Sequence, residues 1–382
     1  RLVNLRVLDA EGKSSDSAVI AAISRAIQLK DRFDIRVINL SLRRPVFESY
    51  TKDPLCQAVE KAWKAGIVVV VAAGNEGRNN AFGTSGYGMI MSPANDPYVI
   101  TVGAMKDMST SNRSDDQIAS YSSKGPAIID HVVKPDLVAP GNQIVSISSG
   151  GRLWSLSSLA VNQIPWSYYV KGGSASSPSY DYFKLSGTSM AAPMVSGAAA
   201  VLLDKRPGLT PDQVKAILMK TATKNFPGSS TVYDPSTGQT FVSYYDIFTV
   251  GAGYLDIWAA LSLSDTPSGS ALSPTAVFDP ETNSVYLAGT TPDGSSAAWG
   301  NSAAWGYSGP YSLSAVWGLN FFVGGSSAAW GNSAVWGNSA VWGLQSTTGF
   351  SAVWGNSAAW GNSAAWGDSA AWGLSTMMAG EK

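Results

Sequence analysis

The 382-residue sequence has little cysteine, one histidine and almost no net charge. Cys56 is the one cysteine, which excludes an internal disulfide; this fits a cytosolic protein and equally a secreted enzyme that uses none. The 26 basic and 27 acidic residues nearly cancel. Neither a nucleic acid nor an anionic membrane surface is therefore an expected partner.

Long apolar runs and a targeting segment are also missing. No run approaches the ~18 residues of a membrane span, so we expect no membrane span. The chain opens with Arg1-Leu-Val-Asn-Leu-Arg-Val-Leu8, which alternates like a strand and has neither an initiator Met nor a signal peptide. We therefore expect part of a longer protein. Its length allows one large domain with an appendage.

The first hundred residues alternate between strand and helix patterns. Ser15 can cap a helix with an apolar stripe through Val19, Ile23 and Ile27, and Asp53-Pro54 begins another helix that stops at Gly66. Predicted strands cover residues 2–8, 35–42, 67–73 and 98–103. Such an alternation predicts an α/β fold, a doubly wound and mostly parallel sheet with helices on both faces.

After residue 150 the sequence indicates a loop, a helix, a linker and a separate C-terminal region. Residues 150–184 are rich in Ser, Tyr and Trp and indicate a surface loop. A capping box at Thr210–Gln213 begins a helix over residues 214–223. We expect one domain over residues 1–262, a Ser- and Pro-rich linker over 263–275, and a C-terminal region over 276–382 that starts with a hairpin over 276–288 around residues 280–283.

An internal repeat dominates the C-terminal region. Ser-Ala-Ala-Trp-Gly-Asn and Ser-Ala-Val-Trp-Gly-Asn recur there, mostly every six residues. The repeated tryptophans are Trp299, Trp305, Trp330, Trp336, Trp342, Trp354, Trp360, Trp366 and Trp372. Short strands joined by Gly-Asn turns, with tryptophans stacked on one another, are the favoured structure. Binding to carbohydrate or a cell surface, and partial disorder, stay open as alternatives.

The most specific stretch is Ser186-Gly-Thr-Ser-Met-Ala-Ala-Pro193, at the start of an apolar helix. Gly187 allows a sharp turn, Thr188 or Ser189 can cap the helix, and Pro193 is expected in its first turn. Ser189 then lies where peptide N–H groups and the positive end of the helix dipole converge. A nucleophilic hydroxyl suits this place, although a Ser before an apolar helix can also be only a cap.

This stretch closely resembles the nucleophile motif of the subtilisin-like serine proteases. Three further stretches, residues 37–42, 68–77 and 134–141, resemble the family's substrate-binding strand, the strand before its oxyanion-hole asparagine and a supporting motif. The resemblance covers residues 1–262 and implies a serine endopeptidase, secreted, acting on an extended polypeptide. It implies Ser189 as nucleophile and Asn75 as oxyanion donor. It implies that substrate is bound by Asn39, Leu40, Ser41, Leu42, Ala73 and Gly74.

Two parts of that machinery are missing from the sequence. The family's Asp-Thr-Gly or Asp-Ser-Gly motif and its His-Gly-Thr motif do not occur, and His131 has the wrong context and chain order for the base. We therefore expect an N-terminally truncated protease that is inactive alone. The alternative is a pseudoprotease whose fold presents the Trp repeats on a surface.

Two further properties of the family are not carried over. Its calcium sites depend largely on a region that this sequence lacks, so none of them is carried over and no cofactor is assigned. Where the family has Gly after the Ser-Leu pair, this chain has Arg43-Arg44. These arginines would either crowd and charge the primary substrate pocket or extend into solvent.

Overall fold

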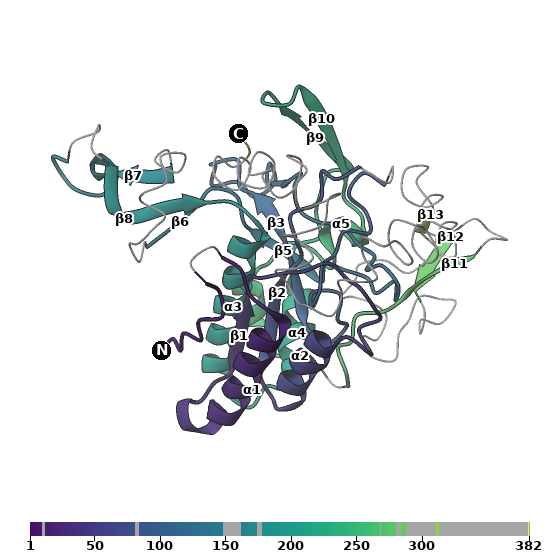
Figure 1. Ribbon diagram of the computed structural model, residues 1–382. Helices are drawn as coiled ribbons and strands as arrows, with labels where there is room; N and C mark the ends of the chain where they lie inside the picture. Colours follow the sequence, from purple (N-terminus) through teal and green to yellow (C-terminus); the bar gives the residue numbers. More distant parts are fainter. Residues whose placement is uncertain are drawn as a thin grey trace.

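A five-stranded sheet forms the centre of the protein (Figure 1). The computed structural model describes residues 1–9, 12–80, 84–147, 162–173, 178–267, 269–279, 284–287, 311–312 and 381. In the sheet, β1 (Val37–Leu40), β2 (Val68–Ala72), β3 (Ile100–Lys106) and β5 (Leu137–Pro140) run parallel, and β4 (Gln117–Ile118) is antiparallel to β3. The predicted α/β fold with a mostly parallel sheet is confirmed.

Helices pack against the sheet. Their capping residues in the sequence predicted where the first two begin. Ser15 caps α1 (Asp16–Phe33), and Asp53 caps α2 (Pro54–Lys64) through its side chain. The nucleophile motif begins α3 (Thr188–Lys205), and a complete capping box begins α4 (Pro211–Thr221). Two short helices, α5 (Ile247–Val250) and α6 (Ile257–Ser262), complete the set in the described residues.

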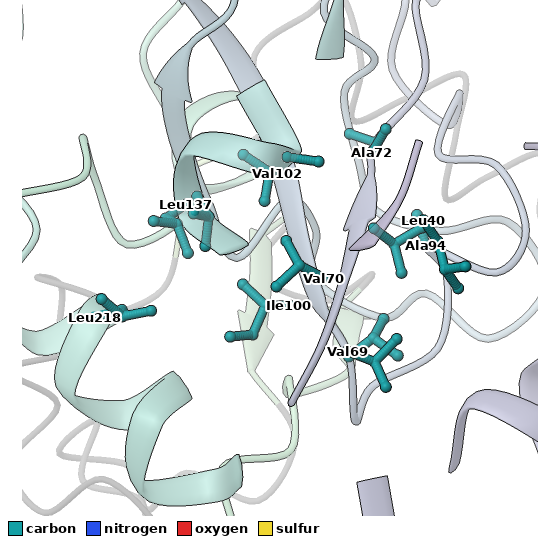
Figure 2. Close-up of a cluster of buried hydrophobic side chains, with 14 of the residues drawn as sticks. Leu40, Val69, Val70, Ala72, Ala94, Ile100, Val102, Leu137 and Leu218 are labelled. Atoms are coloured by element: carbon teal, nitrogen blue, oxygen red, sulfur yellow. The ribbon is translucent and has the colours of Figure 1, made fainter. Parts of the chain in front are cut away.

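Like β3, β2 is buried along its whole length. All five of its residues are buried, which requires cover on both faces of the sheet. The helix α3 packs across β1, β2, β3 and β5, while α2 packs on β2 with α1 beside it. Figure 2 shows part of the resulting core, where Val70 and Ile100 lie together on the side of Leu137, and Leu40 lies beside Ala94 on the other side of the strands.

Two sequence predictions are wrong. Residues 1–9 form no strand and are mostly exposed, since they pair with no strand of the described chain. Residues 150–184 are not simply a loop. They contribute β7 (Gln163–Pro165), a 3₁₀ turn (Trp166–Tyr168) and β8 (Pro178–Leu185), which form an antiparallel sheet with β6 (Ile144–Ile147). The hairpin of β9 (Ser229–Asp234) and β10 (Gln239–Tyr244) was not predicted.

The chain after α6 stays attached to the domain. Ser273 donates to the Asp136 carboxylate at 2.6 Å, and Val133 N donates to Pro274 O at 2.8 Å. The predicted hairpin is present as β11 (Ala276–Asp279) and β12 (Ser284–Leu287), with β13 (Tyr311–Ser312) alongside β12. The repeated tryptophans lie outside the described residues.

Candidate functional site

The start of α3 differs from the predicted cap. Gly187, with φ at 149°, is the N-cap residue, and neither Thr188 nor Ser189 caps the helix through its side chain. Gly187 N donates to Gly141 O at 2.8 Å, which fixes the turn. A Cβ on Gly187 would lie 3.3 Å from Asn75 Nδ2, so glycine keeps this approach open. The Thr188 hydroxyl donates to the side chain of Asn75 instead.

Asn75 lies beside this turn, three residues beyond the end of the buried strand β2. Its Oδ1 accepts from Thr188 N at 2.9 Å and from Thr188 Oγ1 at 3.0 Å. Thr188 Oγ1 in turn accepts from Gly74 N at 3.2 Å. Because Oδ1 is held by Thr188, the amide Nδ2 is oriented as a donor, and it has no partner within the described residues. The structure therefore brings Asn75 to the first residue of α3.

Ser189 is the second residue of α3 and is half-buried. Its hydroxyl has no hydrogen-bond partner among the residues that the structure describes. Among the N–H groups of the first turn, that of Ser189 has no partner in the described chain, and the helix dipole favours negative charge there. A reactive hydroxyl and an oriented amide donor thus flank the same helix end, an arrangement that suits addition to a carbonyl and stabilisation of the resulting oxyanion.

Pro193 creates a specific need at this helix end. It lies in the second turn of α3 rather than the predicted first turn, so the Ser189 carbonyl has no N–H donor four residues on. Ser41 Oγ donates to Ser189 O at 2.8 Å and fills that gap. Asn39 Nδ2 donates to Ser41 Oγ at 3.0 Å and Ser196 Oγ donates to Asn39 Oδ1 at 2.9 Å. This chain of contacts fixes the end of β1 against α3.

The structure divides the residues predicted to bind substrate into two groups. Asn39 and Ser41 are exposed beside the start of α3. Leu40 and Ala73 are buried in the core, with Leu42 packed against it, so their side chains contribute packing. Gly74 is buried too, and a Cβ there would lie 2.7 Å from Ser123 Oγ. Most of these six residues can therefore bind a ligand only through their main-chain groups.

Neither expectation for the two arginines describes Arg44. Its side chain is 4% exposed and pairs with Asp53 at 2.5 Å and with Asp16 at 2.8 Å, so it links α1 and α2 inside the protein. Arg43 stays partly exposed and forms an ion pair with Glu76, the residue after Asn75. Glu76 balances the charge that Arg43 brings to this side of the site.

His131 lies in another part of the protein. Its carbonyl accepts from Ala276 N at 2.8 Å, at the start of β11, and Val132 bridges to Thr275. Figure 1 shows β11 well to the right of α3. Burial lowers the pKa of His131, against the opposing effect of Asp130. It is not among the residues brought to the start of α3.

Sequence reasoning missed Thr188 and Ser123 as parts of the site. Thr188 orients the Asn75 amide, and Ser123 Oγ accepts from Glu76 N at 3.0 Å and supports the turn that carries Asn75. Thr188 stands within the quoted motif, so its own hydroxyl was the available signal. Ser123 reaches the site through a contact between segments 47 residues apart, which no local pattern indicates.

The described chain offers neither a cluster of metal ligands nor a helix that spans a membrane. Its residues contain no group of three or more His, Cys, Asp or Glu side chains placed to hold a metal ion. No helix in the described part is both long enough and apolar enough to cross a membrane.

Curated proteins named as serine proteases or subtilisins are similar in sequence to more than half of this chain. The serine protease AprX of Bacillus subtilis (strain 168) is 37% identical over 57% of this chain and 45% of its own length. Subtilisin DY of Bacillus licheniformis is 35% identical over 58% of this chain and 61% of its own. The extracellular serine proteinase of Thermus sp. (strain Rt41A) is 35% identical over 61% and 43%. The chain thus spans about half the length of these relatives.

A family model also matches this chain, over a slightly longer range than these relatives do. The subtilase family model, Peptidase_S8, matches residues 1–237, more than half of the chain. That range contains β1, β2 and the whole of α3, the elements that bring Asn39, Asn75 and Ser189 together. The chain therefore belongs to the subtilase family.

Proposed function

We propose that this chain carries the nucleophile and the oxyanion donor of a serine-type endopeptidase. Ser189 attacks the carbonyl carbon of a peptide bond, and Asn75 Nδ2 donates to the oxygen that becomes negative, together with the Ser189 N–H. The observation that carries this proposal is the double hydrogen bond from Thr188 to Asn75 Oδ1, which leaves Nδ2 as an unused donor at the helix end that holds Ser189.

The substrate in this proposal is an extended polypeptide. β1 pairs with β2 on one side only, and no other described strand occupies its outer edge. An exposed strand edge can bind a peptide through main-chain hydrogen bonds, and residues 39–42 continue from that edge toward Ser189. One relative is named as an extracellular proteinase, which supports secretion for this protein as well.

Hydrolysis needs a base to accept the Ser189 proton and an acid to orient that base. His131 is the only histidine of the 382 residues and lies elsewhere. We propose that the chain as printed positions substrate and oxyanion but turns over slowly, through the oxyanion hole alone. A surface protein that only presents the Trp repeats is the competing function.

An added base separates the two functions. Imidazole in solution can accept the proton that the chain cannot, so we expect it to accelerate hydrolysis of a chromogenic peptide by the full chain. This acceleration should disappear in Ser189→Ala. It should fall by about 10²- to 10³-fold in Asn75→Ala, the cost of losing one oxyanion donor.

The matched control is Ser114→Ala, at an exposed serine that uses only its main-chain N–H in the local turn. It should respond to imidazole as the unmodified chain does. If imidazole accelerates hydrolysis equally with and without the Ser189 hydroxyl, the endopeptidase proposal is wrong and the presenting role is favoured.

A further inference from the structure

A second polar site shares the loop of Gly141 with the candidate active site and is occupied by a residue of the same chain. Glu381, the second-to-last residue of the printed sequence, is 4% exposed. Its Oε1 accepts from Arg78 Nη2 at 2.9 Å and from Ser120 N at 2.8 Å, with a further short contact from Ser120 Oγ. Three donors thus converge on one carboxylate oxygen.

The main chain of Glu381 is bound as specifically as its side chain. Asn142 Nδ2 donates to Glu381 O at 2.9 Å, and Asn142 Oδ1 accepts from Glu381 N at 2.9 Å. Gln143 Nε2 adds a donor to Glu381 O at 3.1 Å. One amide side chain that pairs with both main-chain groups of a single residue imitates a neighbouring strand, a recurring way to hold a peptide.

The walls of this site are shared with the nucleophile turn. Arg78 follows Asn75 by three residues, and Asn142 follows Gly141, whose carbonyl accepts from Gly187 N. Gln143 N donates to Ser186 Oγ at 2.8 Å. A segment bound here therefore contacts both loops that lead into the candidate active site.

Charge pairing within the site is compatible with release of the segment. Arg78 also pairs with Asp234 at 2.6 Å, so it keeps one carboxylate partner when Glu381 leaves. Glu381 Oε2 is buried and has no hydrogen-bond partner among the described residues, so half of the carboxylate is unsatisfied. Such a group is held less tightly than a fully paired one.

We propose that Arg78, Ser120, Asn142 and Gln143 form a docking site for a glutamyl residue in a peptide, and that its occupant is the segment of this chain that contains Glu381. The carboxylate selects the acidic residue through Arg78 and Ser120. The Asn142 amide holds the peptide main chain. This proposal concerns binding and does not depend on Ser189 being a nucleophile.

The test uses the full chain with Glu381→Ala, which removes the carboxylate from Arg78 and Ser120 without changing the walls of the site. A fluorescein-labelled peptide of residues 374–382 is titrated into each chain, and binding is measured by fluorescence anisotropy. We expect at least tenfold tighter binding to Glu381→Ala than to the unmodified chain, whose site is occupied in cis. A peptide with Gln in place of the glutamate should bind at least tenfold more weakly.

Controls separate docking from general adhesion. Glu48→Ala removes an exposed glutamate elsewhere in the chain, and this variant should bind the peptide as weakly as the unmodified chain does. Adding Arg78→Gln to Glu381→Ala should abolish binding, with folding checked by circular dichroism. Should the Arg78 variant fail to fold, the Glu-to-Gln peptide pair still decides. Equal binding of both peptides, or equal binding to both chains, would overturn the proposal.

Discussion

Two polar clusters of this protein use their hydrogen-bonding groups in opposite ways. The first is the buried cluster of Asp136, Lys134, Lys215 and Ser273, whose three charged side chains are fully buried. Asp136 Oδ2 accepts from Lys134 at 2.8 Å, while Oδ1 accepts from Ser273 at 2.6 Å and lies 3.1 Å from Lys215 Nζ. Lys215 also donates to three carbonyls, Pro97 O, Tyr98 O and Val99 O.

The second cluster, Asn75, Thr188 and Ser189, leaves two groups unused. Asn75 Nδ2 and the Ser189 hydroxyl have no partner within the described chain, and both residues are half-buried rather than sealed. Full pairing stabilises the fold, because each buried polar group loses water and needs a replacement. Unused groups at an accessible helix end are free to bind a ligand. Unsatisfied, accessible polar atoms therefore mark the site better than perturbed charges do.

The largest expected effect comes from breaking the buried cluster with Asp136→Asn. Burial acts to raise the pKa of Asp136, but Lys134 and Lys215 outweigh it and hold the pKa below its usual value. Without that anion, two buried lysines lose their charge partner. We expect a loss of about 3 to 5 kcal/mol in the free energy of unfolding, measured by urea denaturation.

The matched control is Asp265→Asn, which breaks the ion pair with Lys220 at 3.1 Å where both side chains are 40% or more exposed. That pair is solvated, so the expected loss is about 0 to 1 kcal/mol. Similar losses for the two variants would contradict the contrast between a sealed cluster and a surface pair.

A second prediction concerns an unpaired atom that is buried. Asp96 Oδ1 accepts from Tyr98 N at 2.8 Å, but Oδ2 is buried with no partner in the described part of the chain. Burial raises the pKa of Asp96 to about 7. The folded protein therefore retains a proton that the unfolded chain releases near pH 4, and the stability that this proton provides is lost as pH rises toward 7.

Asp96→Asn tests this, since the amide keeps an acceptor for Tyr98 N and carries no titrating charge. We expect its stability to change less than that of the unmodified protein between pH 4 and pH 7, and to exceed it at pH 8. The gain at pH 8 should be on the order of a few kcal/mol. Denaturation midpoints across this range measure it, with exposed Asp31→Asn as the control. Parallel pH curves for Asp96→Asn and the unmodified protein would contradict it.

The sequence predicted the central sheet and the position of Asn75 because local signals suffice there. A strand buried on both faces needs a continuous apolar run, which Val68–Ala72 provides. The loop after its carboxyl end, which contains Asn75, lies at the edge of a parallel sheet where ligands bind. The sheet of β6, β7 and β8 was missed, since β6 pairs with a strand more than thirty residues away. Burial of Arg44 was missed because its two carboxylates come from separate helix starts.

The smallest expected effect lies within the candidate site, at the contact between Ser41 and the Ser189 carbonyl. Ser41→Ala removes the donor that replaces the N–H missing at Pro193, so that carbonyl loses its partner in the protein. Because Ser41 is exposed and water can reach the gap, we expect a loss of about 1 kcal/mol in the free energy of unfolding.

A double-mutant cycle with Pro193→Ala isolates this contact. Alanine at position 193 restores an N–H that can donate to Ser189 O, so Ser41→Ala should cost less in that background than in the unmodified chain. Exposed Ser24→Ala on α1 should cost the same in both backgrounds. If the cost of Ser41→Ala is unchanged by Pro193→Ala, the hydroxyl does not substitute for the missing helical N–H. The end of β1 would then be held against α3 by Asn39 and Ser196 instead.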